Sequence, residues 1–340
     1  MSLGNAAGGG YAAALPRIHL FALGGTIAMG RRAEGGGVVP SLDAAGLIES
    51  VPELASVARL EVTSFRQLPG AHLRFEDLEA LATAIEAKAA EGVRGVIVTQ
   101  GTDTIEETAF ALDRLVDADV AVVVTGAMRN PSTAGADGPA NLLAAARVAS
   151  VATMQDNGCL VVMNDEIHAA RFVRKMHTSR CDAFASPDAG PVGHVVEGRV
   201  RLSMRAGRLA AIARASAPRV ATHIASVMLA LDDDGGLIRL AVAGGYTGVV
   251  VAAVGGGHAA PAAAAAIQDA AKDVDVVLAS RAGAGEVLRA TYGFEGSEID
   301  LQKRGAICAG MLDAVKARVL LALLQRHGGA ADIREAFAAY

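Results

Sequence analysis

Short apolar runs alternate along the chain with longer segments of helical periodicity. Runs of five to seven residues at 17–23, 59–64, 95–99, 120–125 and 159–163 predict strands. Residues 75–90 instead place Leu78, Leu81 and Ile85 three or four positions apart, which predicts a helix with one buried face. A second helix is predicted over the Ala- and Leu-rich residues 139–151. Strands that alternate with helices favour an α/β fold with a mostly parallel sheet covered on both faces.

A second α/β set begins near Val220. It contains the runs ATHIASVMLAL, GVVVAAVGGG and VDVVLAS, an Ala-rich helix from Pro261, and a closing helix over residues 312–324. We therefore expect two α/β domains, over residues 17–200 and 219–340. Residues 1–16 are expected to be a disordered leader. Residues 201–218 are expected to be a solvated, arginine-rich linker that follows a final hairpin or strand.

Composition and the N-terminal sequence indicate the class of ligand and the cellular compartment. With 52% hydrophobic and 20% charged residues the chain can bury a large core, and no apolar stretch reaches the ~20 residues of a membrane span. A net charge of -5 and the absence of Trp argue against nucleic acid, so a small molecule is the expected ligand. Cys159, Cys181 and Cys308 have no paired spacing and predict buried free thiols. The N-terminus lacks a signal peptide, which favours the cytoplasm. The periplasm stays open if a signal was removed.

Polar residues follow the predicted strands at the edge where an open parallel sheet binds ligands. Gly24-Gly25-Thr26 follows the first strand, and its glycines permit a tight turn. The motif is neither a Walker A loop nor GxGxxG. On spacing alone, a turn whose hydroxyl bonds the backbone explains it better than a catalytic site.

The stretch VTQGTDTIEETAF holds the second polar cluster. Thr104 and Glu107 match a T-x-x-E capping box, which predicts that a helix starts there. Thr102 and Asp103 lie just outside this cap. A third cluster, after the strand at 159–163, contains Lys175. A lone lysine is usually solvated, but a lysine beside a hydroxyl and a carboxylate can accept the hydroxyl's proton.

Together these motifs resemble the bacterial-type L-asparaginases, the asparaginase/glutaminase amidohydrolases. GGTIA at 24–28 and GTDTIEETA at 101–109 are similar to the family's two signatures. KMHT at 175–178, followed by AFASP at 183–187, resembles its third segment. In the second domain the resemblance lies in Glu286-Val287, Tyr292-Gly293-Phe294 and KARVLLAL at 316–323.

The resemblance implies a fold, an assembly and a reaction. It implies a larger N-terminal and a smaller C-terminal α/β domain, in a homotetramer whose intimate dimers complete each active site with the partner's C-terminal domain. It implies no metal and no organic cofactor. The implied reaction is hydrolysis of the side-chain amide of L-asparagine to L-aspartate and ammonia, with side activity on glutamine. By motif position Thr26 would form the acyl-enzyme. Thr102 would be the second hydroxyl, with Lys175 as its base and Asp103 as the orienting acid.

The same resemblance implies the substrate contacts. Asp103 and the partner subunit's Glu286 would hold the α-ammonium, and backbone N–H groups around Gly25 and Thr102 are candidates for the oxyanion hole. The family's Ser for the α-carboxylate is not matched in SFRQLPGAHL, where Gln67 or Ser64 would have to serve.

Several positions depart from the family's pattern. Gln100 stands where the family has His before G-T-D-T. Gly37 stands where the mobile loop after GGTIA usually has a Tyr that supports the nucleophile. Gly255-Gly256-Gly257 stands where many members have G-N-G. Substrate identity is therefore less firmly indicated than the type of reaction.

Two alternatives remain. The missing Tyr and the altered carboxylate segment fit a catalytically weak amino-acid-binding protein on an asparaginase scaffold. A subunit that deamidates a misacylated tRNA would share the catalytic module, but it carries an extra N-terminal domain that a 16-residue leader is too short to form. The arginines of residues 199–219 are the only hint of RNA affinity, and a solvated linker explains them better.

Overall fold

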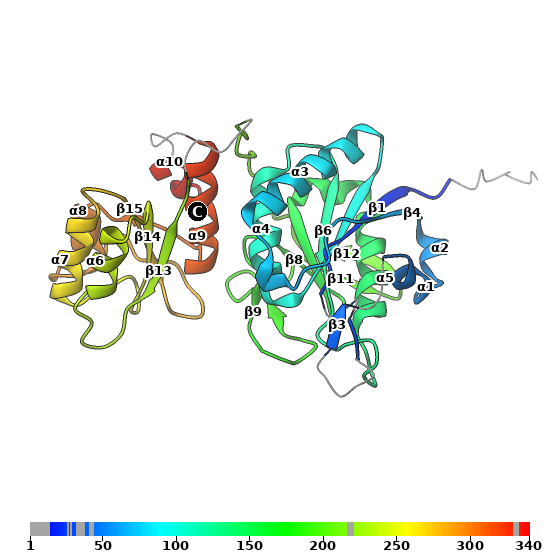
Figure 1. Cartoon of the computed structure of the whole chain (residues 1–340), viewed down its shortest axis with the longest axis horizontal. Helices are drawn as coiled ribbons and strands as arrows, with labels where there is room; N and C mark the ends of the chain where they lie inside the picture. Colours follow the sequence, from blue (N-terminus) through cyan, green and yellow to red (C-terminus); the bar gives the residue numbers. More distant parts are fainter. Residues whose placement is uncertain are drawn as a thin grey trace, which may run out of the picture.

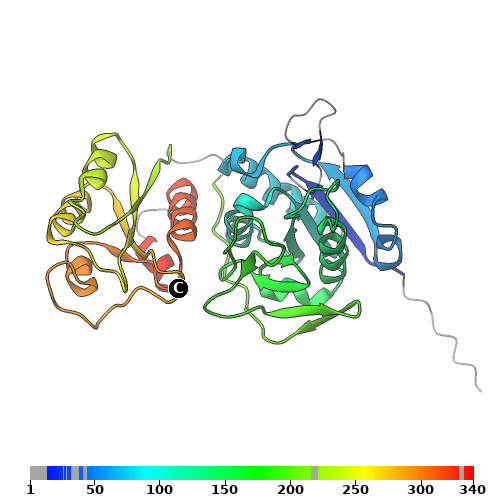
Figure 2. The same ribbon diagram turned by 90° about the horizontal axis from the view of Figure 1, so that it is seen from below.

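Two α/β domains lie side by side in the computed structural model of the chain, each built on its own sheet (Figures 1 and 2). The structure describes residues 14–25, 27, 29–31, 38–40, 44–215, 221–328 and 333–340. Thr26, Gly37 and most of the predicted leader lie outside the described residues. The predicted α/β fold is confirmed.

The N-terminal sheet has eight strands in the order β12-β11-β8-β7-β6-β5-β1-β4. From β4 to β7 all neighbours are parallel, while β8, β11 and β12 extend the sheet in antiparallel pairs. Its strands are β1 (Arg17–Ala22), β4 (Arg59–Ser64), β5 (Gly95–Thr99), β6 (Ala121–Thr125), β7 (Cys159–Met163), β8 (Glu166–Ala169), β11 (Gly193–Val196) and β12 (Arg199–Leu202). Two small antiparallel pairs accompany it: β2 (Met29–Arg31) with β3 (Val38–Pro40), and β9 (Arg174–Lys175) with β10 (Phe184–Ala185).

Both faces of the sheet are buried at its centre, which explains why β5, β6 and β7 are almost entirely apolar. Along β5, Val96 and Val98 join the hydrophobic core under α3 and α4, while Ile97 joins the core under α5. This alternation follows from the two-residue period of a strand. The helices are α1 (Ala44–Glu49), α2 (Leu54–Val57), α3 (Phe75–Ala90), α4 (Ile105–Leu115) and α5 (Gly138–Ala149), with 3₁₀ turns η2 (Gly70–His72), η3 (Thr102–Thr104) and η4 (Ala152–Asn157).

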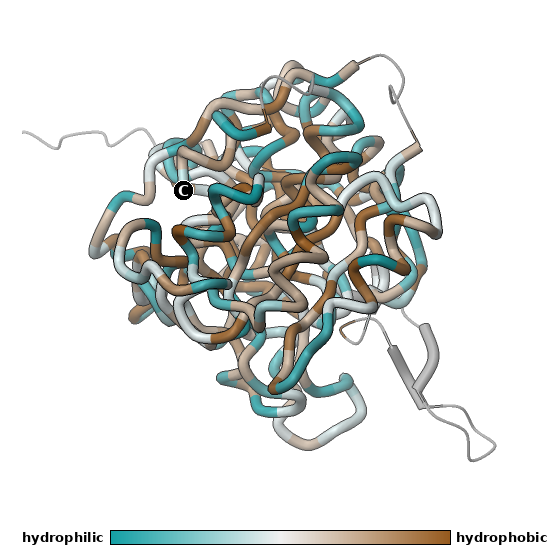
Figure 3. Tube along the Cα trace, turned by 90° about the vertical axis from the view of Figure 1, so that its left-hand side faces the viewer, coloured by the Kyte–Doolittle hydropathy of each residue, from teal (hydrophilic) through white to brown (hydrophobic). Residues whose placement is uncertain are grey.

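The C-terminal sheet has four parallel strands in the order β13-β14-β15-β16. One of its faces is covered by α6 and α7, and the other by α9, which lies between this sheet and the N-terminal domain (Figure 1). Seen from the side of this domain, hydrophobic stretches gather in the middle of the molecule and hydrophilic ones lie mostly around the rim (Figure 3). The elements are β13 (Ile224–Met228), α6 (Gly236–Ala243), β14 (Gly248–Ala253), α7 (Pro261–Ala270), β15 (Asp275–Ser280), α8 (Glu298–Lys303), β16 (Ile307–Cys308), α9 (Ala314–His327) and α10 (Ile333–Ala338).

The two domains share one hydrophobic cluster, in which Phe110 of α4 and Leu320 of α9 both take part. A group of ion pairs lies at the same interface, at the C-terminal end of α9. There the Arg326 guanidinium donates to the Glu79 carboxylate at 2.6 Å and to the Glu76 carboxylate at 2.8 Å. The interface is therefore both apolar and charged.

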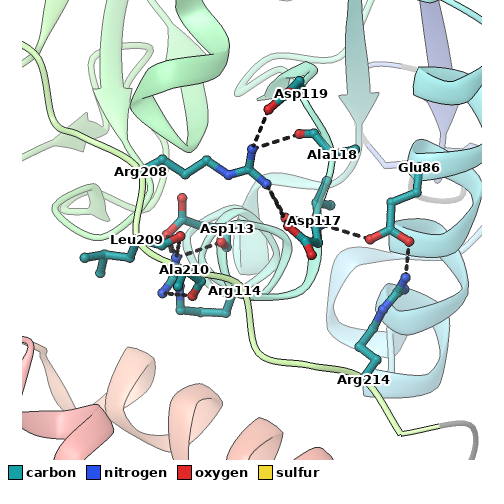
Figure 4. A network of polar contacts seen from close by, with 11 residues as sticks. Glu86, Asp113, Arg114, Asp117, Ala118, Asp119, Arg208, Leu209, Ala210 and Arg214 are labelled. Carbon is teal, nitrogen blue, oxygen red and sulfur yellow. Dashed lines mark hydrogen bonds and ion pairs between the residues drawn. The ribbon is translucent and has the colours of Figure 1, made fainter.

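The predicted solvated linker is wrong for its first part, because its arginines bind the N-terminal domain (Figure 4). Arg208 donates to the carbonyls of Val116 and Ala118, at 2.8 and 2.9 Å. Arg214 donates to the Glu79 carbonyl at 3.0 Å and pairs with Glu86. The carbonyls of Val116 and Ala118 lie just past the end of α4 and lack partners within the helix, so the Arg208 guanidinium satisfies them and fixes the segment to the domain surface.

The cysteine prediction holds for two of the three thiols. Cys159 and Cys308 are free and buried. Cys181 is free but only half-buried, because it lies in the loop between β9 and β10.

Candidate active site

The loops that follow β1 and β5 touch each other at two glycines. Gly24 and Gly25 have φ angles of 104° and 91°, which side chains other than glycine rarely adopt. A Cβ on Gly25 would lie 2.0 Å from the backbone nitrogen of Gly101. Gly25 precedes Thr26 in the sequence, and Gly101 precedes Thr102. The described backbone thus brings the glycines that precede Thr26 and Thr102 in the sequence into contact at the carboxyl edge of the sheet.

Thr102, Asp103 and Lys175 come together at this edge. The Lys175 Nζ lies 2.9 Å from the Thr102 Oγ1 and 2.7 Å from the Asp103 Oδ1. Thr102 is buried, whereas the Asp103 side chain is 73% exposed. The amine therefore sits between a sheltered hydroxyl and a carboxylate that faces solvent. This arrangement supplies a hydroxyl, a base within hydrogen-bond reach and a group that orients the base.

An open depression of about 530 Å³ lies beside this group, lined by Asp103, Lys175, Met176, His177 and Thr178. A second depression of about 600 Å³ lies between α3, α4 and the linker, far from these residues in the fold. Although the second is larger, only the first contains a paired base and carboxylate, so we take the first as the candidate site.

The helix after Thr102 starts where the sequence predicts, but the predicted capping box is wrong. Helix α4 begins at Ile105, and the Thr104 side chain makes no capping hydrogen bond. The Thr104 hydroxyl instead donates to the Gly70 carbonyl at 3.0 Å. This bond is possible because η2 packs beside η3. The contact fixes the Thr102 loop to the segment that follows β4.

Buried charges lie directly behind Lys175. The Glu106 Oε2 accepts the backbone N–H of Lys175 at 3.3 Å and lies 3.8 Å from the Lys316 Nζ. Burial raises the pKa of the Glu106 carboxyl, against the opposing effect of Lys316. Burial also raises the pKa of the Asp313 carboxyl, but the ammonium and backbone N–H of Lys316, together with Arg174, lower it overall.

Comparison with known proteins assigns the chain. Residues 17–208 match the family described as asparaginase, N-terminal, and residues 223–337 match the glutaminase/asparaginase C-terminal domain. The chain belongs to the asparaginase family. A probable L-asparaginase of Deinococcus radiodurans is 38% identical to it over 96% of this chain and 98% of that protein. The L-asparaginase of Bacillus licheniformis is 36% identical over 91% of this chain and 95% of that protein.

A solved structure agrees with this assignment. The probable cytoplasmic L-asparaginase from Campylobacter jejuni superposes with a TM-score of 0.84 at 31% identity, covering 96% of this chain and 100% of that one. As the sequence resemblance implies, the larger α/β domain, which carries Thr102, comes first in the chain, and the smaller one follows it. Within the described part of the chain no helix is long and apolar enough to cross a membrane.

Two further predicted residues lie near the loop of Gly24. The backbone of Gln67 and Leu68 runs within contact distance of a Cβ on Gly24. Gln67 itself is exposed at the same edge of the sheet. Gln100, the residue that departs from the family's His, is fully buried and donates to the Gly101 carbonyl and the Thr104 hydroxyl, both at 3.3 Å. Gln100 therefore supports the Thr102 loop from below.

Glu286 does not join the other predicted site residues within the described part of the chain. It is exposed on the C-terminal domain, in the loop between β15 and α8. That loop is held by the N-terminal domain, because the Arg174 guanidinium donates to the Gly283 carbonyl at 2.6 Å and the Gly285 N–H donates to Asp188, also at 2.6 Å. The sequence had not singled out Arg174, Glu106 or Lys316 as neighbours of the site, because their contacts cross between domains.

Proposed function

We propose that this asparaginase-family chain hydrolyses the side-chain amide of L-asparagine to L-aspartate and ammonia. The observation that carries the proposal is the pair of contacts from the Lys175 amine to the Thr102 hydroxyl and the Asp103 carboxylate. Its relatives in Deinococcus radiodurans and Bacillus licheniformis are named as L-asparaginases, which supports the choice of substrate.

In the first step, the Thr26 hydroxyl attacks the amide carbon. Its proton passes to the amide nitrogen, the C–N bond breaks, and ammonia leaves a Thr26 ester of the substrate. The packing of Gly25 against Gly101 supports a position for Thr26 close to Thr102. Backbone N–H groups around Gly25 and Thr102 stabilise the tetrahedral oxyanion, at a few kcal/mol per donor in comparable sites.

In the second step, water attacks the ester carbon. Lys175 accepts a proton through the Thr102 hydroxyl, and Asp103 orients the amine and balances the charge that develops on it. The ester bond to Thr26 breaks, the proton held by Lys175 passes to the Thr26 oxygen, and aspartate leaves. Two hydroxyls, an amine and a carboxylate complete the cycle without histidine.

Substrate binding in this proposal needs a second subunit. In this proposal the exposed Asp103 pairs with the α-ammonium, and Gln67, which is also exposed, meets the α-carboxylate. Glu286 of the partner subunit completes the site, since Glu286 of the same chain lies on the other domain. Exposed apolar residues on the C-terminal domain support an oligomer, and we propose a tetramer that works in the cytoplasm. These residues are Met228, Leu231, Leu237, Leu240 and Tyr246.

The test is ammonia release from asparagine and glutamine by the wild type, Thr26→Ala, Thr102→Val and Lys175→Met. We expect the wild type to prefer asparagine and the Thr102 and Lys175 variants to lose about 10²–10⁴-fold in kcat, the usual contribution of positioned acid–base groups. Thr83→Val is the matched control, because the Thr83 hydroxyl on α3 bonds the Glu79 carbonyl and not Lys175.

Other outcomes would decide against this mechanism. Wild-type turnover by both Thr26→Ala and Thr102→Val would exclude it. Tight binding of asparagine in calorimetry, without ammonia release by the wild type, would favour the amino-acid-binding alternative. Light scattering checks the tetramer separately.

A further inference from the structure

Lys316 is a buried cation at the domain interface. It lies in the first turn of α9, and only 1% of its surface is exposed. Its Nζ lies 2.7 Å from the Asp313 Oδ2 of its own helix and 3.8 Å from the Glu106 Oε2 of α4. A fully buried ammonium is costly unless it is paired, so its position between two carboxylates is a specific arrangement.

Glu106 connects this cation to the candidate site. It follows Thr102 and Asp103 in one continuous turn formed by η3 and α4, and its Oε2 accepts the backbone N–H of Lys175. The same short segment therefore holds Lys175 at both ends. Thr102 and Asp103 contact its amine, and Glu106 holds its backbone amide. Strand β9 is only two residues long, so its pairing with β10 alone fixes Lys175 weakly.

The charges around Glu106 explain why Lys316 matters. Burial disfavours the charged Glu106 carboxylate, and the nearby Asp313 adds to this effect, whereas Lys316 and Arg174 favour the charged form. Glu107 lies on the same helix turn. Burial and Asp313 also disfavour the charged form of its carboxyl, whereas Arg318 and Lys316 favour the charged form. A carboxylate accepts a hydrogen bond more strongly when it is ionised.

We propose that Lys316 is a positioning residue for Lys175. The C-terminal domain uses Lys316 to hold Glu106 against the Lys175 amide, which keeps the Lys175 amine between Thr102 and Asp103. The proposal rests on the proposed amidohydrolase function. It gives the C-terminal domain a part in the acid–base group of its own chain, beside any residue it lends to a partner.

The same helix supplies a matched control. Arg326 is also buried, also lies on α9 and also pairs with carboxylates of the N-terminal domain. It lies ten residues after Lys316, about 15 Å along the helix axis, and its partners are on α3. Loss of Arg326 weakens the domain contact without touching Glu106. Comparing the two variants therefore distinguishes a general weakening of the domain interface from a specific displacement of Lys175.

The experiment compares the wild type, Lys316→Met and Arg326→Met for kcat, KM and thermal unfolding. We expect Lys316→Met to lower kcat about ten- to hundredfold through displacement of Lys175, with KM changed less than about threefold. Arg326→Met is expected to unfold at a lower temperature and to keep its kcat. Equal loss of kcat in both variants, or an unchanged kcat in Lys316→Met, overturns the proposal.

A second readout needs no substrate. Hydrogen exchange of the Lys175 backbone amide reports its bond to Glu106 directly, and we expect faster exchange in Lys316→Met than in the wild type or Arg326→Met. Suppose that the wild type releases no ammonia while its Lys175 amide is protected only when Lys316 is present. That result overturns the proposed hydrolysis and leaves the positioning of Lys175 by Lys316 intact. Unchanged protection overturns the positioning alone.

Variants of Glu106 complete the test. Glu106→Gln keeps a neutral acceptor that needs no cation, so adding Lys316→Met to it should lower kcat further by less than about threefold. If Lys316→Met does not fold, Glu106→Ala and Glu106→Gln decide the question. The proposal predicts a kcat at least about tenfold lower for Ala than for Gln, and equal values would overturn it.

Discussion

The carboxyl edges of the two sheets are built alike and hold different groups. Both follow parallel strands and both begin with glycine loops, after β1 and β5 in one domain and after β14 and β15 in the other. The first edge gathers a hydroxyl, a carboxylate and an amine around open space. At the second edge, the Glu298 carboxylate is fully buried and accepts the N–H groups of Thr291 and Tyr292, both at 2.7 Å. Topology places an edge, and the side chains decide whether it does chemistry or holds a loop.

The glycines of the two edges differ in the same way. Gly25 and Gly285 both have positive φ angles, 91° and 89°. A Cβ on Gly25 would overlap the backbone of Gly101, whereas a Cβ on Gly285 would meet nothing within 4 Å among the described residues. At the first edge the glycine permits two loops to touch, and at the second it permits only a turn.

The largest expected effect tests this difference. Gly25→Ala should lower the free energy of unfolding by at least about 3 kcal/mol and abolish ammonia release, because backbone atoms of Gly101 cannot move aside as a side chain could. Gly285→Ala should cost only about 1–2 kcal/mol, the usual cost of a left-handed conformation with a Cβ. Denaturant unfolding and ammonia release measure both. Similar losses in the two variants would show that the close approach at Gly25 has no special role.

An intermediate effect is expected at Glu298, whose electrostatics differ from those behind Lys175. Burial raises the pKa of the Glu298 carboxyl, but the N–H groups of Tyr292, Thr291 and Glu298 and the His258 ring together hold this pKa below its ordinary value. The charged form thus stabilises the fold above the ordinary pKa, and this contribution is lost as the pH falls through the lowered one. Glu298→Gln should cost about 2 kcal/mol at pH 7, since it weakens hydrogen bonds to a charged acceptor. The cost should shrink towards pH 3, and urea unfolding at the two pH values measures it. A cost that does not depend on pH would contradict a charged Glu298.

The sequence predicts most of the fold because the strands are buried on both faces and the helices on one. These patterns appear in β5 and α3 as an unbroken apolar run and as a three-to-four-residue period. Helix α10 was missed, since residues 333–338 are too few for a periodic signal. The prediction for the linker was wrong because the sequence pattern of an arginine-rich segment does not show whether its side chains face water or bind carbonyls at a helix end.

For the candidate site, motifs indicated residues that the structure brings together, but not the residues that support them. Thr102, Asp103 and Lys175 were named by pattern, and the structure brings them together. The role of Thr26 stays a prediction, since that residue lies outside the described part of the chain. The second layer, Glu106 and Lys316, is separated by 210 positions and depends on how α4 and α9 pack. No local sequence pattern indicates that two residues so far apart in the chain lie close together in space.

The smallest expected effect has the opposite sign to that of Glu298. Burial raises the pKa of the Glu107 carboxyl above its ordinary value, and Arg318 only partly opposes it. At pH 7 the charged form therefore costs stability, and this cost disappears as the pH falls below the ordinary pKa, where Glu107 is protonated in both folded and unfolded chains. Glu107→Gln should stabilise the chain by about 1 kcal/mol or less at pH 7, because a neutral amide is easier to bury. The gain should vanish near pH 4. Thermal unfolding at both pH values measures it, and Glu107→Gln and Glu298→Gln should shift the melting temperature in opposite directions at pH 7. A shift in the same direction would mean that the two edges do not differ in how they hold charge.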